Sequence, residues 1–212
     1  MKYGAAPARA TERGGHLRVA ASILTHGLAH RASFGWRCRR GCAILPPVKN
    51  KNPCTVRSAG FLDADGIYSL IKAYPRELLA RPLSDIVQNI DRFIVCEKDG
   101  KVVGTVSWSI LPEIGHARHP SVEIKSLSVK RSLRKHGVGR MLVEAAIERI
   151  RGLKPEQIIV LTFTPEFFGR LGFRTVPKET LMHKLYAGCI NCAKYDSPFT
   201  CPEVAMSMEL RR

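Results

Sequence analysis

The 212-residue chain has 45% apolar residues and a formal net charge of +16. Its length accommodates one folded domain with an appendage and is too short for two full domains. No uninterrupted apolar run reaches the roughly 18 to 20 residues of a membrane-spanning helix, so we expect a soluble protein without a membrane partner.

The N-terminal quarter carries much of the positive charge. Residues 1–54 contain ten Lys and Arg against the single acid Glu12, without a sustained hydrophobic period, which predicts a basic, disordered extension. An organelle transit peptide, an over-extended translation start and a binding tail are all compatible with it. We favour an extension without function, a cytoplasmic protein, and one folded domain over residues 55–212.

Short strands and helices are predicted in the first half of this domain. Their hydrophobic periods indicate a strand beginning at Val56, helices at 63–73 and 82–90, and strands at 93–97 and 101–110. Between the last two strands lies Asp99-Gly100, a pair that suits the type I′ turn of a two-residue hairpin.

The second half begins with an alternating strand, residues 121–129. Period-two alternation predicts that Glu123, Lys125, Leu127 and Val129 share one face of it. The amphipathic pattern of residues 138–150 predicts a helix that Gly152 closes. The remaining elements expected are a strand at 157–163, a short helix at 165–170, and strands at 173–176 and 204–210.

A basic, glycine-containing loop joins the alternating strand to this helix. It reads Arg134-Lys135-His136-Gly137-Val138-Gly139-Arg140. Glycine permits a positive φ and close backbone approach, and a helix N-terminus adds partial positive charge, so the loop is suited to holding a diphosphate. A turn with solvated basic side chains is the alternative. The spacing matches neither a Walker loop nor a Rossmann loop.

This part of the sequence resembles the acetyl-CoA site of GNAT acetyltransferases. The resemblance lies in the order of its parts: a strand, the glycine loop, a helix, a further strand, and then Phe167-Phe168-Gly169-Arg170-Leu171-Gly172-Phe173. The resemblance covers residues 55 to the C-terminus. It implies an α/β (α+β) fold: a mixed, mostly antiparallel sheet with flanking helices, whose fourth and fifth strands splay apart around pantetheine. It also implies cofactor contacts from Leu127, Val129, Phe168 and the loop Arg134 to Arg140.

Three stretches resemble amino-acid N-acetyltransferases of the N-acetylglutamate synthase type, in the short form without a kinase domain. They are Leu79-Ala80-Arg81, residues 122–129, and Leu161-Thr162 with the Phe-Phe and Gly-Phe pairs that follow. The resemblance implies acetylation of the α-amino group of a free amino acid. L-glutamate is the favoured acceptor, and its acetylation is the first step of arginine biosynthesis. As partners we expect the amino acid and acetyl-CoA, and a homodimer is an open alternative to a monomer.

The reaction needs a base, because an α-amino group is largely protonated near neutral pH. Glu123 is the candidate, since it lies four residues before Leu127, where related enzymes place a catalytic Glu. A strand Glu that pairs with Lys125, or that is exposed on an uncovered face of the sheet, is the alternative. The backbone N–H of Leu127 is the expected donor to the oxyanion.

Arg81 and Lys125, followed by Lys184, are candidates for binding the carboxylates of glutamate through charge-assisted hydrogen bonds. For each of them, a solvated surface charge is the alternative. Many members of the superfamily protonate the CoA thiolate with a Tyr where this chain has Phe168. Water or Tyr186 could supply that proton instead.

The C-terminal segment contains a set of residues spaced as zinc ligands can be. His183, Cys189, Cys192 and Cys201 could form a structural tetrahedral site. Three reduced thiols beside a substrate pocket are the alternative. An odd number of cysteines, seven in all, favours a reducing compartment, and Cys96 is expected to be a buried, inert thiol.

Two other functions stay open. One keeps the fold and acetylates a protein or a polyamine, although a basic pocket disfavours cationic acceptors. The other is a non-enzymatic nucleic-acid or regulatory module that uses the basic extension. No basic strand carries interleaved aromatic residues of the kind that stack bases, so we expect no nucleic-acid partner.

Overall fold

The computed structural model describes residues 54–111, 120–192 and 194–210. Apart from Cys54, the predicted basic extension lies outside these residues. None of the described helices combines the length and the apolar character that crossing a bilayer requires.

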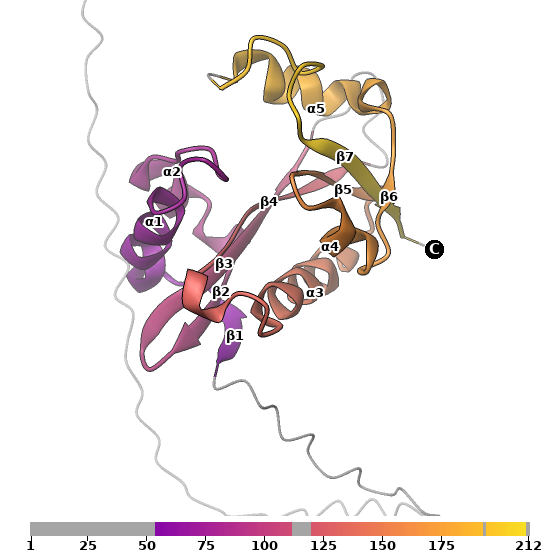
Figure 1. Cartoon of the computed structure of the whole chain (residues 1–212). Helices are drawn as coiled ribbons and strands as arrows, with labels where there is room; N and C mark the ends of the chain where they lie inside the picture. The colour runs from indigo at the N-terminus through magenta and orange to yellow at the C-terminus, as the bar shows by residue number, and fades with distance from the viewer. Residues whose placement is uncertain (1–53, 112–119, 193, 211–212) are drawn as a thin grey trace, which may run out of the picture. The chain divides into compact units, whose positions relative to one another are not determined.

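Seven strands form one mixed sheet in the order β1-β2-β3-β4-β5-β7-β6 (Figure 1). Among the described strands, β4 and β5 run parallel and the other neighbours run antiparallel. The expected mixed, mostly antiparallel sheet is confirmed. The strands are β1 (Thr55–Ser58), β2 (Phe93–Lys98), β3 (Lys101–Ile110), β4 (Val122–Val129), β5 (Gln157–Thr162), β6 (Arg174–Thr175) and β7 (Val204–Glu209).

Helices cover both faces of the sheet. On one face, α3 (Val138–Arg151) and α4 (Pro165–Gly169) pack on alternate apolar residues such as Ile94 and Ile124. On the other face, α1 (Ala64–Lys72) and α2 (Leu83–Gln88) pack on Phe93 and Val95, and α5 (Met182–Ala187) begins directly after the buried Leu181. Short 3-10 helices, η1 to η5, cover Phe61–Asp63, Ile90–Arg92, Arg131–Leu133, Lys178–Leu181 and Cys189–Asn191.

Two local geometries follow from glycine. The predicted hairpin turn is confirmed, because Asp99 and Gly100 have φ of 51° and 70°, as a type I′ turn requires. Gly104 on β3 lies under the first turn of α3. A Cβ there would come within 2.9 Å of Leu142 and 3.2 Å of Val138, so the absence of a side chain permits the close packing of α3.

β4 contains a β-bulge that the sequence did not predict. The pairing with β3 shifts in register between Thr105 and Ser107. Ser126 and Leu127 therefore lie together opposite one residue of β3. Ser126 has φ of 55°, in the left-handed region that bulge residues use.

The alternation predicted for β4 is wrong beyond this bulge. We expected Glu123, Lys125, Leu127 and Val129 to share a face. Leu127 and Val129 instead pack into the core under α3, on the same side as Ile124, because the extra residue reverses the alternation. Glu123 and Lys125 lie on the opposite face, toward α5 and α2.

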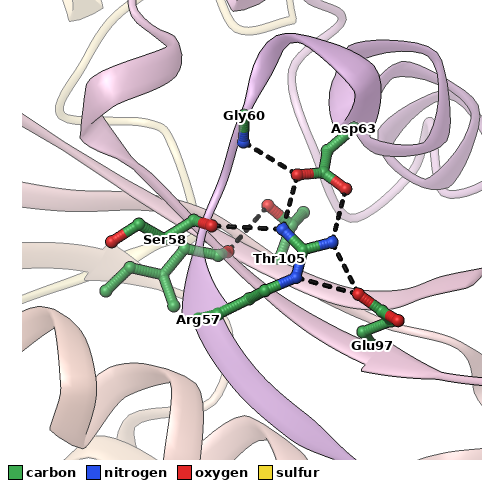
Figure 2. A network of polar contacts seen from close by, with 7 residues as sticks. Arg57, Ser58, Gly60, Asp63, Glu97 and Thr105 are labelled. Carbon is green, nitrogen blue, oxygen red and sulfur yellow. Dashed lines mark hydrogen bonds and ion pairs between the residues drawn. The ribbon is translucent and has the colours of Figure 1, made fainter. Parts of the chain in front are cut away.

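A polar network ties β1 to η1 and β2 (Figure 2). Both terminal nitrogens of Arg57 donate to the Asp63 carboxylate, at 2.7 and 2.8 Å, and Arg57 also pairs with Glu97 at 2.6 Å. The N–H of Gly60 donates to Asp63 at 2.8 Å. These contacts hold the start of α1 against the sheet, because Asp63 is the residue before that helix.

Candidate active site

The site lies where β4 and β5 separate. Within the described residues, β4 pairs with β5 only at Val122 and Glu123, and both strands continue beyond that point. The backbone of Leu127 therefore lies on a strand edge that β5 does not cover. Unpaired donors and acceptors of such an edge are available to a ligand, which fits a pantetheine lying in the gap.

Glu123 and Lys184 form a buried ion pair at the start of this gap. The Nζ of Lys184, on α5, lies 2.7 Å from Glu123 Oε1, and the side chains are 14% and 7% exposed. Burial would lower the pKa of Lys184, but attraction to the Glu123 carboxylate outweighs it, so that pKa is raised. The other carboxylate oxygen lies 3.5 Å from the Ser109 hydroxyl.

Arg81, between α1 and α2, reaches the same face of the sheet. Its Nη1 donates to the hydroxyls of Ser107 and Ser126, both at 3.1 Å, and its Nε pairs with Asp85 at 2.5 Å. The guanidinium also stacks on Phe93 at 5.2 Å. The β4 bulge turns Ser126 toward Arg81, and these contacts fix the guanidinium at the site rather than in solvent.

Lys125 lies on the same face as Glu123, between the other charges. Burial lowers its pKa; Arg81 and Lys184 lower it further, while Glu123 and Asp85 act in the opposite sense. Lys125 therefore lies close enough to Arg81 and to Lys184 for both to affect its pKa, which places the three predicted carboxylate binders on one side of the sheet. Such a group of cations favours an anionic ligand.

The backbone of the glycine loop has the geometry expected of an anion cradle. Gly137 is the N-cap of α3 with φ of 85°, and Lys135 has φ of 67°. The imidazole of His136 lies 2.8 Å from the Arg134 carbonyl. Left-handed residues ahead of a helix turn successive N–H groups toward one concave site.

The side chains of this loop do not all face solvent. Val138 is buried in the core, whereas Arg140 pairs with Glu144 at 2.7 Å on the exposed side of α3. Gly139 faces the ring of Phe167, which a Cβ would meet at 3.6 Å. Arg140 is exposed and Gly139 is half-exposed.

Phe168 is a core residue. It is 3% exposed and makes edge-to-face contacts with Phe167 and Phe173 at 5.0 and 5.4 Å between ring centroids. This packing fixes α4 against β6 and β7, and Phe167 lies beside Gly139 of α3. Phe168 can therefore shape the gap from beneath but has no acidic proton for a leaving group.

The zinc expectation finds no support in the described residues. No group of three or more His, Cys, Asp and Glu residues among them is arranged to hold a metal ion. His183, Cys189, Cys192 and Cys201 are thus not assembled as ligands: His183 lies on α5, Cys189 in η5, Cys192 directly after η5, and Cys201 in the connection that precedes β7. Cys201 lies 3.6 Å from the Glu203 carboxylate.

A small cavity adjoins the gap on the side of the C-terminal segment. Lys194 of that segment donates to the Leu78 carbonyl at 2.8 Å, which brings it against the connection between α1 and α2. The cavity beneath is lined by Glu77, Leu79, Phe163, Cys192, Lys194, Tyr195 and Glu203. Burial is the main reason that the pKa of Glu203 is raised.

Sequence reasoning missed the polar partners that orient the predicted residues. Ser107, Ser126 and Asp85 hold Arg81, yet a serine in a strand or an acid in a helix gives no signal by itself. The i, i+4 spacing of Arg81 and Asp85 was the one signal available. No local sequence signal indicates the contact of Lys184 with Glu123, because 61 positions separate the two residues.

Comparison with known families and proteins agrees with this geometry. The sequence profile of the acetyltransferase (GNAT) family matches residues 64–173. The chain is 32% identical over 153 residues to an uncharacterized N-acetyltransferase of Chlorobaculum tepidum, covering 71% of this chain and 93% of that protein. It is 29% identical over 146 residues to an amino-acid acetyltransferase of Mycobacterium tuberculosis, covering 66% and 79%.

A solved structure has the same fold. It is the crystal structure of N-acetylglutamate synthase from Neisseria gonorrhoeae complexed with coenzyme A and N-acetyl-glutamate, with a TM-score of 0.60 and 22% identity. The similarity covers 75% of this chain and 35% of the synthase.

Proposed function

The chain belongs to the acetyltransferase (GNAT) family, and on that premise we propose that it transfers the acetyl group of acetyl-CoA to the α-amino group of a free amino acid, with L-glutamate as the acceptor. The relative from M. tuberculosis is named an amino-acid acetyltransferase, and the synthase from N. gonorrhoeae was crystallised with coenzyme A and N-acetyl-glutamate. Both names support this choice of acceptor.

The ion pair of Lys184 and Glu123 carries the proposal. An α-amino acid is a zwitterion whose ammonium and carboxylate lie on one carbon. It can insert into the pair with its ammonium on Glu123 and its α-carboxylate on Lys184, so each buried charge keeps a partner. A simple amine would displace Lys184 and leave that ammonium buried without a counter-charge.

Arg81 and Lys125 support an acidic side chain on the acceptor. After the α-carboxylate is paired, Lys125 and the Arg81 guanidinium, whose Nε already pairs with Asp85, lie on the same face to bind a second carboxylate. A planar guanidinium can bind a carboxylate through two parallel hydrogen bonds. A polyamine would bring further positive charge toward Arg81, Lys125 and Lys184, which disfavours it.

The proposed chemistry uses the residues around the gap. Glu123 removes a proton from the acceptor ammonium, and the amine attacks the thioester carbonyl. The N–H of Leu127 donates to the oxyanion on the exposed edge of β4. The C–S bond then breaks, the nitrogen loses its second proton, and water relays that proton to the CoA thiolate, since Phe168 has no proton to give and Tyr186 is 55% exposed.

The cofactor is proposed to lie along β4 and over the loop before α3. Leu127 and Val129 would contact pantetheine through their backbone. The pyrophosphate would bind the N–H groups between Lys135 and Gly139, at the N-terminus of α3. Two left-handed residues in that loop support this placement.

Release of CoA from acetyl-CoA by the full chain tests the proposed function. The acceptors compared should be free amino acids, peptides with free N-termini and polyamines. We expect turnover with glutamate to exceed that with every polyamine. Turnover with peptides or polyamines and none with amino acids would overturn the choice of acceptor and keep the family.

A further inference from the structure

Arg134 stands at the first position of the loop that we assign to the pyrophosphate, yet its side chain faces away from that loop. Its Nη1 and Nη2 donate to the two carboxylate oxygens of Glu77, at 3.1 and 2.9 Å. Its Nε donates to the Val129 carbonyl at 3.1 Å. These donors are therefore occupied before any cofactor binds.

Tyr74 completes the contact between the two segments. Its ring lies under the Arg134 guanidinium at 4.5 Å, and its hydroxyl accepts a hydrogen bond from the Arg131 N–H at 2.8 Å. Arg131 begins η3, which leads directly into the loop. Tyr74 and Glu77 thus hold both ends of η3, the part of the chain that aims the loop at the gap.

The same connection between α1 and α2 carries Arg81 at its other end. A turn in which the Glu77 and Leu78 N–H groups donate to the Tyr74 carbonyl, at 3.1 and 3.0 Å, makes it compact. Arg81 follows four residues after Glu77 and is held by Ser107 and by the bulge residue Ser126. One short segment therefore touches the proposed cofactor loop and the proposed acceptor site.

We propose that Glu77 is a positioning residue that, through Arg134, couples the loop for the CoA pyrophosphate to the segment that carries Arg81. Cofactor binding, which orders the loop, then also orders the acceptor site. The two charges are partly exposed, at 34% for Arg134 and 51% for Glu77, so an ion pair alone would contribute little. The bidentate geometry and the tyrosine beneath it make the contact directional.

This inference rests on the proposed position of the pyrophosphate but needs no acceptor. Amide hydrogen exchange of the full chain, with and without saturating CoA, measures the coupling directly. In the native protein, CoA should slow exchange at residues 131–141 and also at 74–89. In Glu77→Gln, CoA should slow exchange at 131–141 and leave 74–89 at the rate of the free protein.

Glu148→Gln is the matched control. It removes the ion pair of Glu148 with Arg151 near the C-terminal end of α3, on exposed side chains, and should behave as the native protein does. Tyr74→Phe keeps the ring under Arg134 and loses the acceptor for the Arg131 N–H. It should weaken the effect at 74–89 without abolishing it.

The outcomes separate the inference from its premise. If CoA does not slow exchange at 131–141 in the native protein, the proposed cofactor site is wrong. If it slows that loop but not 74–89, or if Glu77→Gln transmits the effect fully, the coupling is wrong. Loss of the effect in Glu148→Gln would also overturn the coupling, because the loss of any ion pair would then be enough to abolish the effect.

We expect the CoA Kd of Glu77→Gln to rise about threefold to fivefold.

Discussion

The Lys184 ammonium lies 2.7 Å from the Glu123 carboxylate, and this pair links α5 near the end of the chain to β4 in the middle of the sheet. In the proposed function Glu123 is the base, and it would have to exchange its ion-pair partner before accepting a proton from a substrate. Under that proposal the pair selects for acceptors that offer a replacement for both charges.

Replacing Lys184 with Met should weaken selection for amino acids. The variant loses the partner proposed for the α-carboxylate, so kcat/KM for glutamate should fall at least about tenfold, the loss expected for one buried charge-assisted hydrogen bond. The ratio of turnover with glutamate to turnover with butylamine should fall as well. Initial rates with both acceptors measure this ratio.

Lys101→Met, at the exposed start of β3, is the control and should leave the ratio unchanged. Removing Lys184 also leaves a buried carboxylate unpaired, so thermal unfolding should be measured alongside the rates. An unchanged ratio in a folded Lys184→Met protein would contradict the exchange of partners.

Replacing Glu123 with Gln should slow the chemical step. The amide keeps the size of the side chain but cannot accept a proton from an ammonium, and a positioned base contributes roughly 10² to 10⁴ in rate. We expect kcat to fall by that factor. Glu166→Gln, on α4 outside the site, should retain the native kcat, and a Glu123→Gln variant with native kcat would rule out this base.

Replacing Arg81 should raise the KM for glutamate. Arg81→Ala removes the cation held over Phe93 by Ser107 and Ser126. Arg81→Lys should fail to restore glutamate binding, because one ammonium cannot donate the two parallel hydrogen bonds that a planar guanidinium gives to a carboxylate. The measurement is KM for glutamate at saturating acetyl-CoA.

The KM of the Arg81→Lys variant for acetyl-CoA should stay within about twofold of the native value, since Arg81 is not placed against the cofactor. Full rescue by lysine would mean that only charge is needed at this position. It would contradict a bidentate contact with the acceptor.

Much of the fold could be predicted because the local signals agree with the tertiary structure. The Asp99-Gly100 turn and the amphipathic helix α3 are examples, since φ preferences and hydrophobic period act within a few residues. The β4 bulge could not be predicted. Ser126 has no intrinsic preference for positive φ, and its conformation depends on the pairing with β3.

The sequence predicts which types of residue belong to the candidate site, but it does not predict which partners their side chains contact. Arg81, Lys125 and Lys184 were chosen for their charge, and the structure brings them to one face. Arg134 is one of the loop residues predicted to hold the pyrophosphate, yet its side chain binds Glu77. Which partner a long cation selects depends on contacts between distant segments, and no period or motif in one sequence records them.

Cys96 should be inert toward alkylation in the folded protein. It is fully buried beneath α3, and burial is the main cause that raises its pKa to about 12. At pH 8 very little thiolate forms, and the thiolate is the reactive species. Mass spectrometry after iodoacetamide treatment should find Cys96 unmodified in the native state and modified in urea. Modification at equal rates in both states would contradict this environment.

Replacing Asp63 with Asn should lower stability in a pH-dependent way. Hydrogen bonds from Arg57 are the main cause that lowers the pKa of Asp63. The unfolded chain therefore binds a proton more readily than the native protein does. The contribution to the free energy of unfolding is present above the ordinary pKa of about 3.9 and is lost as the pH falls through the lower native value.

Urea unfolding at pH 7 should show Asp63→Asn destabilised by about 1 to 2 kcal/mol, toward the lower end of the range for buried charged partners. Arg57 is 39% exposed, and solvent screens the pair. The difference between the two proteins should shrink near pH 3. Asp65→Asn, on the exposed side of α1, should match the native protein at both pH values, and a difference for Asp63→Asn that grows on acidification would show that Arg57 does not stabilise the ionised carboxylate.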